Sequence, residues 1–300
     1  MGHTVDIDCR LDYAVEQPAE FLMQLQAAWH PGQQIVRERL QVTGATGEPV
    51  FFEDVTGLNR LFRFSADPGS VQVRYEATVT VQTLLRDPSW PENDLRDIPG
   101  PVLHYLLPSR YCESDLLGDM ARRTFGRLPR GFGRVEAICD WIQNHIEYLP
   151  GSSTATTSAR DVLQNRAGVC RDFAHLGITF CRALNIPARF VFGYVEFADP
   201  PPDFHALFEA WVGGQWVLFD PTKMAPIEKL VRIGTGVDAK DVAFATLYGA
   251  VRMLGMQPLV QDHMPGQDPV FEAPAWTIGA QRGRREGAGE AQQVASPDQV

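Results

Sequence analysis

The segment 168–187 constrains the fold most, because its pattern predicts one helix that has a cysteine in its first turn and that ends abruptly before a proline. Two neighbouring helical rows run along it, one apolar (Val169, Phe173, Leu176, Phe180) and one of small side chains (Cys170, Ala174, Gly177, Cys181). A row of small side chains lets a helix lie close against a sheet. The helix should end near Asn185, because the residue before Pro187 is disfavoured in a helix.

Three strands are predicted after this helix, at residues 188–197, 206–212 and 216–219. The last two are joined by a turn at Gly213 and Gly214, so they form a hairpin in which paired residue numbers sum to about 427. His205 then lies opposite Thr222 and within two residues of Asp220. A helix followed by an antiparallel sheet predicts an α+β fold.

Cys170, His205 and Asp220 are the candidate catalytic residues. A thiol nucleophile, an imidazole base and an orienting carboxylate are the parts needed for acyl transfer through a thioester. The free N–H groups and the dipole of a helix start favour a thiolate at Cys170. Each residue alone has an ordinary explanation: a small buried cysteine, a structural histidine at the mouth of a strand, and an Asp-Pro turn. Their combination predicts a catalytic site.

The N-terminal part, residues 1–87, is predicted to be a β-sandwich. Apolar residues alternate with polar ones from Val5 to Val15 and again from Val71 to Val81, which is typical of strands with one buried face. Residues 21–29 fit either a strand or a helix. Residues 88–110, which carry five prolines, are expected to form a connector over the surface.

Residues 111–265 are predicted to form the catalytic domain. Ser114 and Asp115 can cap a helix that runs to about Phe125, and Ser158 with Asp161 can cap a short helix near Val162. Four apolar residues recur on one helical face (Val135, Ile138, Ile142, Ile146). Residues 275–300 are rich in Gly, Gln, Ala and Arg without periodicity, so we expect a disordered tail.

Composition limits the partners. The net charge of -10 argues against nucleic acid, because phosphate binding needs a basic excess. No apolar run approaches the roughly 18 residues that cross a bilayer, so no membrane partner is expected. Charged residues interrupt the first 13 positions, which argues against a secretory signal. The five scattered cysteines are expected to be free thiols, and the chain to be cytoplasmic.

Three sequence blocks resemble the bacterial transglutaminase-like family. The first is GVCRDFAHL at 168–176, with RALNIPAR at 182–189; the others surround His205 and FDPT at 219–222. The run IGTGVDAKDV at 233–242 is similar to the segment that follows these blocks, and the β-rich first part to the family's usual N-terminal domain. The resemblance covers about residues 5–261. It implies a papain-like core, a helix bearing Cys170 on an antiparallel sheet, and a Cys170–His205–Asp220 triad.

Three further residues are predicted near the substrate. Gly168 would keep the approach to Cys170 open for a substrate backbone, and Phe204 flanks His205. Leu207 stands where the family often has Trp. Glu209 matches a frequent family acid, but it lies about 13 Å from His205 along a strand, so we interpret it as structural.

Other candidates near Cys170 are weaker. The backbone N–H of Cys170 is expected to supply one oxyanion donor. Trp141 or Asn144 could supply the second, although nothing in the sequence selects them. No metal or cofactor is predicted, because His175 lies about 140° around the helix from Cys170 and cannot share an ion with it.

The leading hypothesis is a cysteine enzyme that acts on amide bonds of peptide or protein substrates. Water as acyl acceptor would give a protease or amidase, and an amine would give a transglutaminase. A cytosolic enzyme that cross-linked freely would attack its neighbours, so hydrolysis is favoured. The alternative is a non-catalytic peptide-binding or assembly protein that keeps the fold. The sequence does not indicate the oligomeric state.

Overall fold

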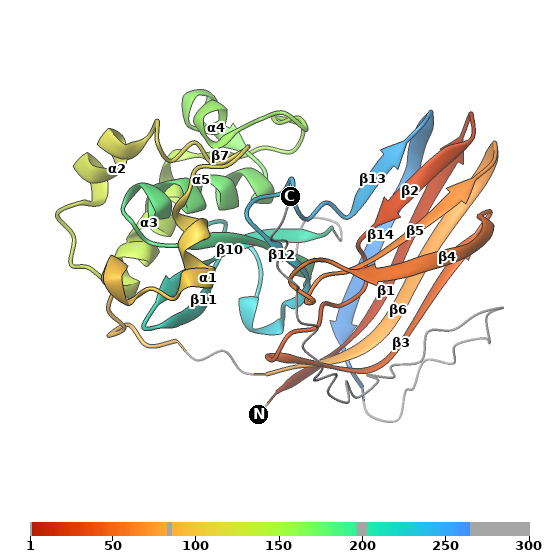
Figure 1. The fold of residues 1–300 in the computed structure, drawn as a ribbon, viewed down its shortest axis with the longest axis horizontal. Helices are drawn as coiled ribbons and strands as arrows, with labels where there is room; N and C mark the ends of the chain where they lie inside the picture. The colour runs from red at the N-terminus through yellow and green to blue at the C-terminus, as the bar shows by residue number, and fades with distance from the viewer. Residues whose placement is uncertain (1, 83–85, 197–202, 265–300) are drawn as a thin grey trace, which may run out of the picture.

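The computed structural model describes residues 2–82, 86–196 and 203–264 of the 300-residue chain. A β-sandwich lies beside a second part, in which helices pack on a separate sheet (Figure 1). Strands in the three four-stranded sheets pair antiparallel, so the predicted α+β fold is confirmed. The predicted tail, 275–300, lies outside the described residues.

The sandwich consists of two four-stranded sheets, in the orders β14-β1-β6-β3 and β13-β2-β5-β4. Its first six strands are β1 (His3–Val15), β2 (Ala19–Met23), β3 (Gln33–Thr43), β4 (Thr46–Glu53), β5 (Arg60–Ala66) and β6 (Gly69–Val81). Alternate side chains of β1 and β6 are buried, among them Tyr13 and Tyr75. The period-two pattern therefore predicted these two strands correctly.

The segment 21–29 is a strand only at its start, where it belongs to β2. The residues after Met23 are irregular but buried, and their backbone groups bond to distant parts of the chain. Gln24 N–H donates to the carbonyl of Phe244, and Ala28 N–H donates to that of Arg232. These bonds satisfy buried backbone groups without a helix and tie the sandwich to the second part.

The end of the described chain returns to the sandwich, which corrects the predicted boundary at residue 265. Strand β13 (Ala245–Tyr248) pairs with β2, and β14 (Val251–Asp262) pairs with most of β1, from Val5↔Asp262 to Val15↔Val251. The two strands complete sheets whose edges at β1 and β2 would otherwise be open. Residues 245–262 therefore belong structurally with the N-terminal strands.

The second part contains the predicted sheet, with one strand more than expected. Its order is β11-β10-β9-β12, from β9 (Ala188–Tyr194), β10 (His205–Val212), β11 (Gln215–Phe219) and β12 (Val231–Gly236). The pairing Phe208↔Phe219 gives the predicted sum of 427, so the predicted register is confirmed. The short turn η3 (Ile227–Lys229) precedes β12.

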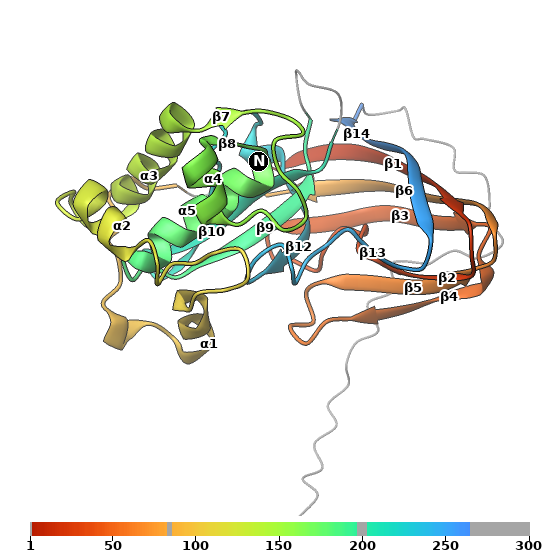
Figure 2. The ribbon, with the colours of Figure 1, turned by 90° about the horizontal axis from the view of Figure 1, so that it is seen from above.

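Helix α5 (Cys170–Ala183) packs on β9 and β10 (Figure 2). The helices α2 (Gly118–Phe125), α3 (Phe132–His145) and α4 (Ala159–Asn165) pack on α5 in turn. The predicted cap of α4 is present, because Ser158 and Asp161 form a capping box. Helix α2 begins later than predicted, after Leu117 and without a side-chain cap. None of the helices within the described residues has the length and apolar character needed to cross a membrane.

The connector 88–110 packs against the second part through short helical turns. These are η1 (Leu95–Asp97), α1 (Gly100–Leu103) and η2 (His104–Leu106). Val102 and Tyr105 are buried, and the Tyr105 ring meets Trp216 of β11 edge-on at 5.1 Å. The carboxylate of Glu92 forms a buried ion pair with Arg134 of α3.

Replacement of Gly193 tests how closely β9 and β12 approach each other. A Cβ at Gly193 would lie 2.1 Å from the carbonyl oxygen of Val231, a backbone atom of the neighbouring strand. We expect Gly193→Ala to separate the strands and to lower the free energy of unfolding by about 2 kcal/mol or more, measured in urea. The matched control is Gly133→Ala in α3, where the added Cβ meets nothing within 4 Å. Equal stability of the two variants would contradict this account.

Candidate functional site

Cys170 is the first residue of α5, and its position is fixed by Asp172. Val169 N–H donates to Oδ2 of Asp172 (2.9 Å), and Asp172 N–H donates back to the carbonyl of Val169 (2.8 Å). The Asp172 carboxylate is fully buried and pairs with Arg171 (3.0 Å). A carboxylate in the first turn satisfies otherwise free N–H groups and favours a rigid helix start. Cys170 itself is half-buried.

Gly168 has a structural role at this helix start. It is buried, and a Cβ there would lie 2.8 Å from the Cβ of Asp172. Glycine is therefore required by the close approach of the Asp172 side chain. The sequence analysis instead explained the glycine by access of a substrate backbone to Cys170, and no contact among the described residues tests that role.

His205 and Asp220 meet at the open end of the β10–β11 hairpin. His205 begins β10, Asp220 follows β11, and Nε2 of the histidine lies 2.8 Å from Oδ2 of the aspartate. The other carboxylate oxygen accepts from the N–H (2.9 Å) and the hydroxyl (2.8 Å) of Thr222. Nε2 of His205 thus faces Asp220, and Cys170 lies close enough to raise the pKa of the same imidazole. The structure therefore brings Cys170, His205 and Asp220 close to one another.

The electrostatics of this pair favour a protonated imidazole. Burial lowers the pKa of His205, but hydrogen bonds to Asp220 and Cys170 and their charges outweigh burial and raise this pKa to about 10. For Asp220, burial raises the pKa, but the hydrogen bond and charge of His205 outweigh burial, so the pKa is lowered from its ordinary value. The buried pair is therefore imidazolium and carboxylate at neutral pH.

Phe204 and Leu207 occupy different places from those predicted. The Phe204 carbonyl oxygen lies 4.0 Å from the Cys170 thiol, whereas its ring is buried against Tyr194 and Phe244. Leu207 is fully buried in a small cluster with Val191, Val195, Leu218 and Leu230. Its side chain is therefore not available to a substrate, and the predicted contact at Leu207 is wrong.

Tyr148 is a site residue that the sequence analysis missed. It lies in β7 (Glu147–Tyr148), which pairs in parallel with β8 (Ala167–Gly168) and places Tyr148 opposite Gly168. Burial and the charges of Cys170 and Asp203 raise the pKa of Tyr148, whereas the backbone of Cys170 lowers it, so the hydroxyl lies close to Cys170. A two-residue strand is too short to show a periodic hydrophobic pattern. The only signal in the sequence is that Tyr148 follows the end of α3 at His145 by three residues.

Of the two oxyanion candidates from the sequence, Asn144 uses its amide donor within α3, and Trp141 packs through its ring. Nδ2 of Asn144 donates to the carbonyl of Asp140 (2.7 Å), and the ring of Trp141 stacks on His145 (4.1 Å). Tyr148, opposite Gly168, is a further side chain beside Cys170. Glu209 is structural as expected, because buried Arg189 and Arg232 hold its carboxylate.

No metal site emerges near Cys170. His175 is fully buried, its Nε2 accepts from Ala239 N–H (3.2 Å), and its ring stacks on Tyr111 (4.9 Å). Over 2–82, 86–196 and 203–264, no group of three or more His, Cys, Asp or Glu side chains is arranged to hold a metal ion.

The chain is similar to known proteins in its fold and in the segment of the site. The family model described as the transglutaminase-like superfamily core matches residues 119–221. A crystal structure of a "Putative Cysteine Protease from Cytophaga hutchinsonii" aligns with 92% of this chain and 94% of that one, with a TM-score of 0.84 and 39% identity.

Curated relatives match over a shorter region. An uncharacterized protein of Mycobacterium leprae (strain TN) is 37% identical over 120 residues, which are 36% of this chain and 42% of that protein. An uncharacterized protein of Mycobacterium tuberculosis (strain ATCC 25618 / H37Rv) is 34% identical over 116 residues, 34% of this chain and 37% of that protein. The chain thus spans less than half of the length of these relatives.

Histidine-ring NMR tests the electrostatics of the pair. We expect His205 to remain protonated at about pH 8 and to titrate near pH 10, and Asp220→Asn to lower this pKa because burial then dominates. The pKa of folded His205 lies above the ordinary value of 6.5. The ion pair therefore contributes fully to the free energy of unfolding below pH 6.5, and this contribution is lost as the pH rises toward 10.

The internal control for this titration is His30. Burial and the charge of Arg232 lower the pKa of His30 to about 4, so this ring should stay neutral over the same pH range. Titration of His205 near its ordinary value in both the wild type and Asp220→Asn would contradict the assignment.

Proposed function

Because the chain belongs to the transglutaminase-like superfamily, we propose that it is a cysteine-dependent enzyme that cleaves or transfers amide bonds of peptides or proteins. The observation that carries the proposal is the 2.8 Å bond between His205 and Asp220, with Cys170 at the helix start beside it. Three different elements, α5, β10 and the end of β11, supply the three groups. This convergence is what nucleophilic acyl transfer requires.

The proposed reaction begins with the Cys170 thiolate paired with the His205 imidazolium. The sulfur attacks the amide carbonyl carbon, and the carbonyl electrons move to oxygen to give a tetrahedral oxyanion. Backbone N–H of Cys170 and the hydroxyl of Tyr148 stabilise that oxyanion. When the C–N bond breaks, Nδ1–H of His205 protonates the leaving amine. A thioester on Cys170 remains, with a neutral imidazole beside it.

The second half of the proposed reaction reverses these roles. Neutral His205 takes a proton from water or from an incoming amine, which attacks the thioester and releases Cys170 as thiolate. Asp220 keeps the ring oriented throughout and stabilises its charged form. We propose that water is the main acceptor, in line with the protease name of the Cytophaga hutchinsonii relative.

The setting proposed for this enzyme is the cytosol, with a peptide or protein substrate and without nucleic acid. The five cysteines are free thiols, which suits a reducing compartment. The net charge of -10 disfavours binding to phosphate backbones.

Alkylation of the thiols tests the nucleophile. We expect iodoacetamide to modify Cys170 first at neutral pH, because it is half-buried and lies beside a protonated His205. The control is Cys112, which is fully buried, and burial raises the pKa of its thiol to about 12. Peptide mapping by mass spectrometry measures both rates. Equal labelling of Cys170 and Cys112 would refute the proposed nucleophile.

Substitutions at the site test the proposed roles. Mass spectrometry of peptide libraries, incubated with and without a primary amine, identifies the substrate and separates hydrolysis from transfer.

Cys170→Ala should abolish turnover, and Asp220→Asn should reduce it by about 10²–10⁴-fold. Tyr148→Phe should reduce kcat by about 10²-fold through loss of one oxyanion donor, whereas Tyr248→Phe, at the exposed end of β13, serves as the control. Full activity in both Cys170→Ala and Asp220→Asn would contradict the triad, and an unreactive Cys170 with no turnover would favour a binding protein.

A further inference from the structure

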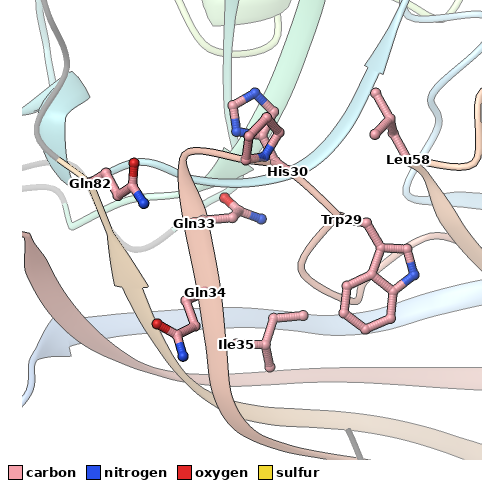
Figure 3. Close-up of a pocket in the computed structure, with 8 residues that line it drawn as sticks. Trp29, His30, Gln33, Gln34, Ile35, Leu58 and Gln82 are labelled. Carbon is pink, nitrogen blue, oxygen red and sulfur yellow. The ribbon is translucent and has the colours of Figure 1, made fainter. Parts of the chain in front are cut away.

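Two adjoining cavities lie where the sandwich meets the catalytic sheet, away from Cys170. Their volumes are about 500 and 510 Å³, and both are lined by His30, Pro31, Leu58 and Gln82. The first cavity is drawn in Figure 3, where Trp29, Gln33, Gln34 and Ile35 complete its wall. The second extends along β11 and reaches Arg189, Glu209 and Arg232.

The second cavity carries a residual positive charge. Glu209 is held by two guanidinium groups, with Arg189 Nη2 at 2.6 Å and Arg232 Nη2 at 2.8 Å from its oxygens. Burial raises the pKa of Glu209, but both arginines outweigh it and lower this pKa to about 2, so the carboxylate stays charged. His30, with its pKa lowered to about 4, adds no charge. Two cations and one anion leave one positive charge in a largely buried place.

The cluster still has donors for a ligand. Both arginines bond to Glu209 through Nε and Nη2, so Nη1 of each guanidinium lies outside this contact. The guanidinium of Arg189 stacks on the half-buried Trp216 (4.2 Å), whose indole also lines the cavity. Arg86 lines the cavity as well, but it donates to the carbonyl of Leu218 (2.6 Å) and pairs with Glu136 (3.3 Å).

The first cavity has no charged wall when His30 is neutral. Gln34 and Gln82 are exposed amides that can donate and accept, and Trp29 and Ile35 offer apolar surface. The Nδ1 atom of His30 accepts from Gly32 N–H (2.9 Å), so its Nε2 carries the proton and is a donor. This wall suits an uncharged chain that contains amide groups.

We propose that the two cavities form one binding site for an elongated, otherwise uncharged ligand with a terminal carboxylate. The carboxylate lies against Arg189 and Arg232, and the uncharged part extends along Trp29, Gln34 and Gln82. A monoanion balances the residual charge, whereas a dianion such as phosphate would leave one negative charge uncompensated in a poorly solvated place. A peptide C-terminus and a small organic acid share this chemistry.

The site is independent of the proposed reaction, so binding is measured on the Cys170→Ala protein by titration calorimetry. The probes are N-acetyl-trialanine with a free carboxylate, the same peptide as its C-terminal amide, and acetate. We expect the peptide acid to bind about tenfold or more tightly than the amide, the difference associated with a hydrogen bond to a charged group. Acetate binding as tightly as the peptide acid would identify small organic acids as the ligand source; weaker binding of acetate would identify peptide C-termini.

A charge substitution locates the site without disturbing the buried cluster. Gln82→Glu places a negative charge on the wall of both cavities at an exposed position, and we expect it to weaken binding of the peptide acid about tenfold. The control is Gln257→Glu, the same change on exposed β14 of the sandwich. Equal affinity for acid and amide, no binding of either at millimolar concentration, or an unchanged affinity in Gln82→Glu would overturn the proposal.

Discussion

The geometry of the site depends on how closely α5 approaches β10. The contact runs through Gly177, where a Cβ would lie 2.5 Å from the ring of fully buried Phe208. Cys170 lies two turns earlier on the same helix, and His205 begins the same strand. Cys170 and His205 are therefore carried by one packed pair of elements. Because a packed core deforms little, this contact positions the sulfur and the imidazole more firmly than loops could.

The local part of this arrangement could be predicted from the sequence. The row of small residues predicted close packing of α5, and the glycine turn of the hairpin fixed the register that brings His205 to Asp220. The cap formed by Ser158 and Asp161 could also be predicted, because the two residues are only three positions apart in the sequence. Such features depend on short sequence separations, over which helix and hairpin geometry leave few alternatives.

The features that escaped prediction depend on contacts between distant segments. Strand β14 is mostly exposed and lacks a clear alternation, so its pairing with β1 left no pattern to read. Tyr148 reaches Cys170 only because a two-residue parallel pair joins it to Gly168. The burial of Leu207 depends on side chains of β9, β11 and the segment before β12, which no pattern within β10 could reveal.

Polar contacts from the sandwich hold β12, the edge strand of the catalytic sheet. The Asn59 side chain pairs with both backbone groups of Thr235, Gln24 donates to the carbonyl of Ile233 (3.2 Å), and Gln33 bonds to both backbone groups of Arg232. Without the sandwich, these buried backbone groups would lose their partners and β12 would become an open edge. Arg232 also holds Glu209 on β10, the strand that begins with His205. The sandwich thus supports the sheet β11-β10-β9-β12 directly, through contacts that reach the strand on which His205 lies.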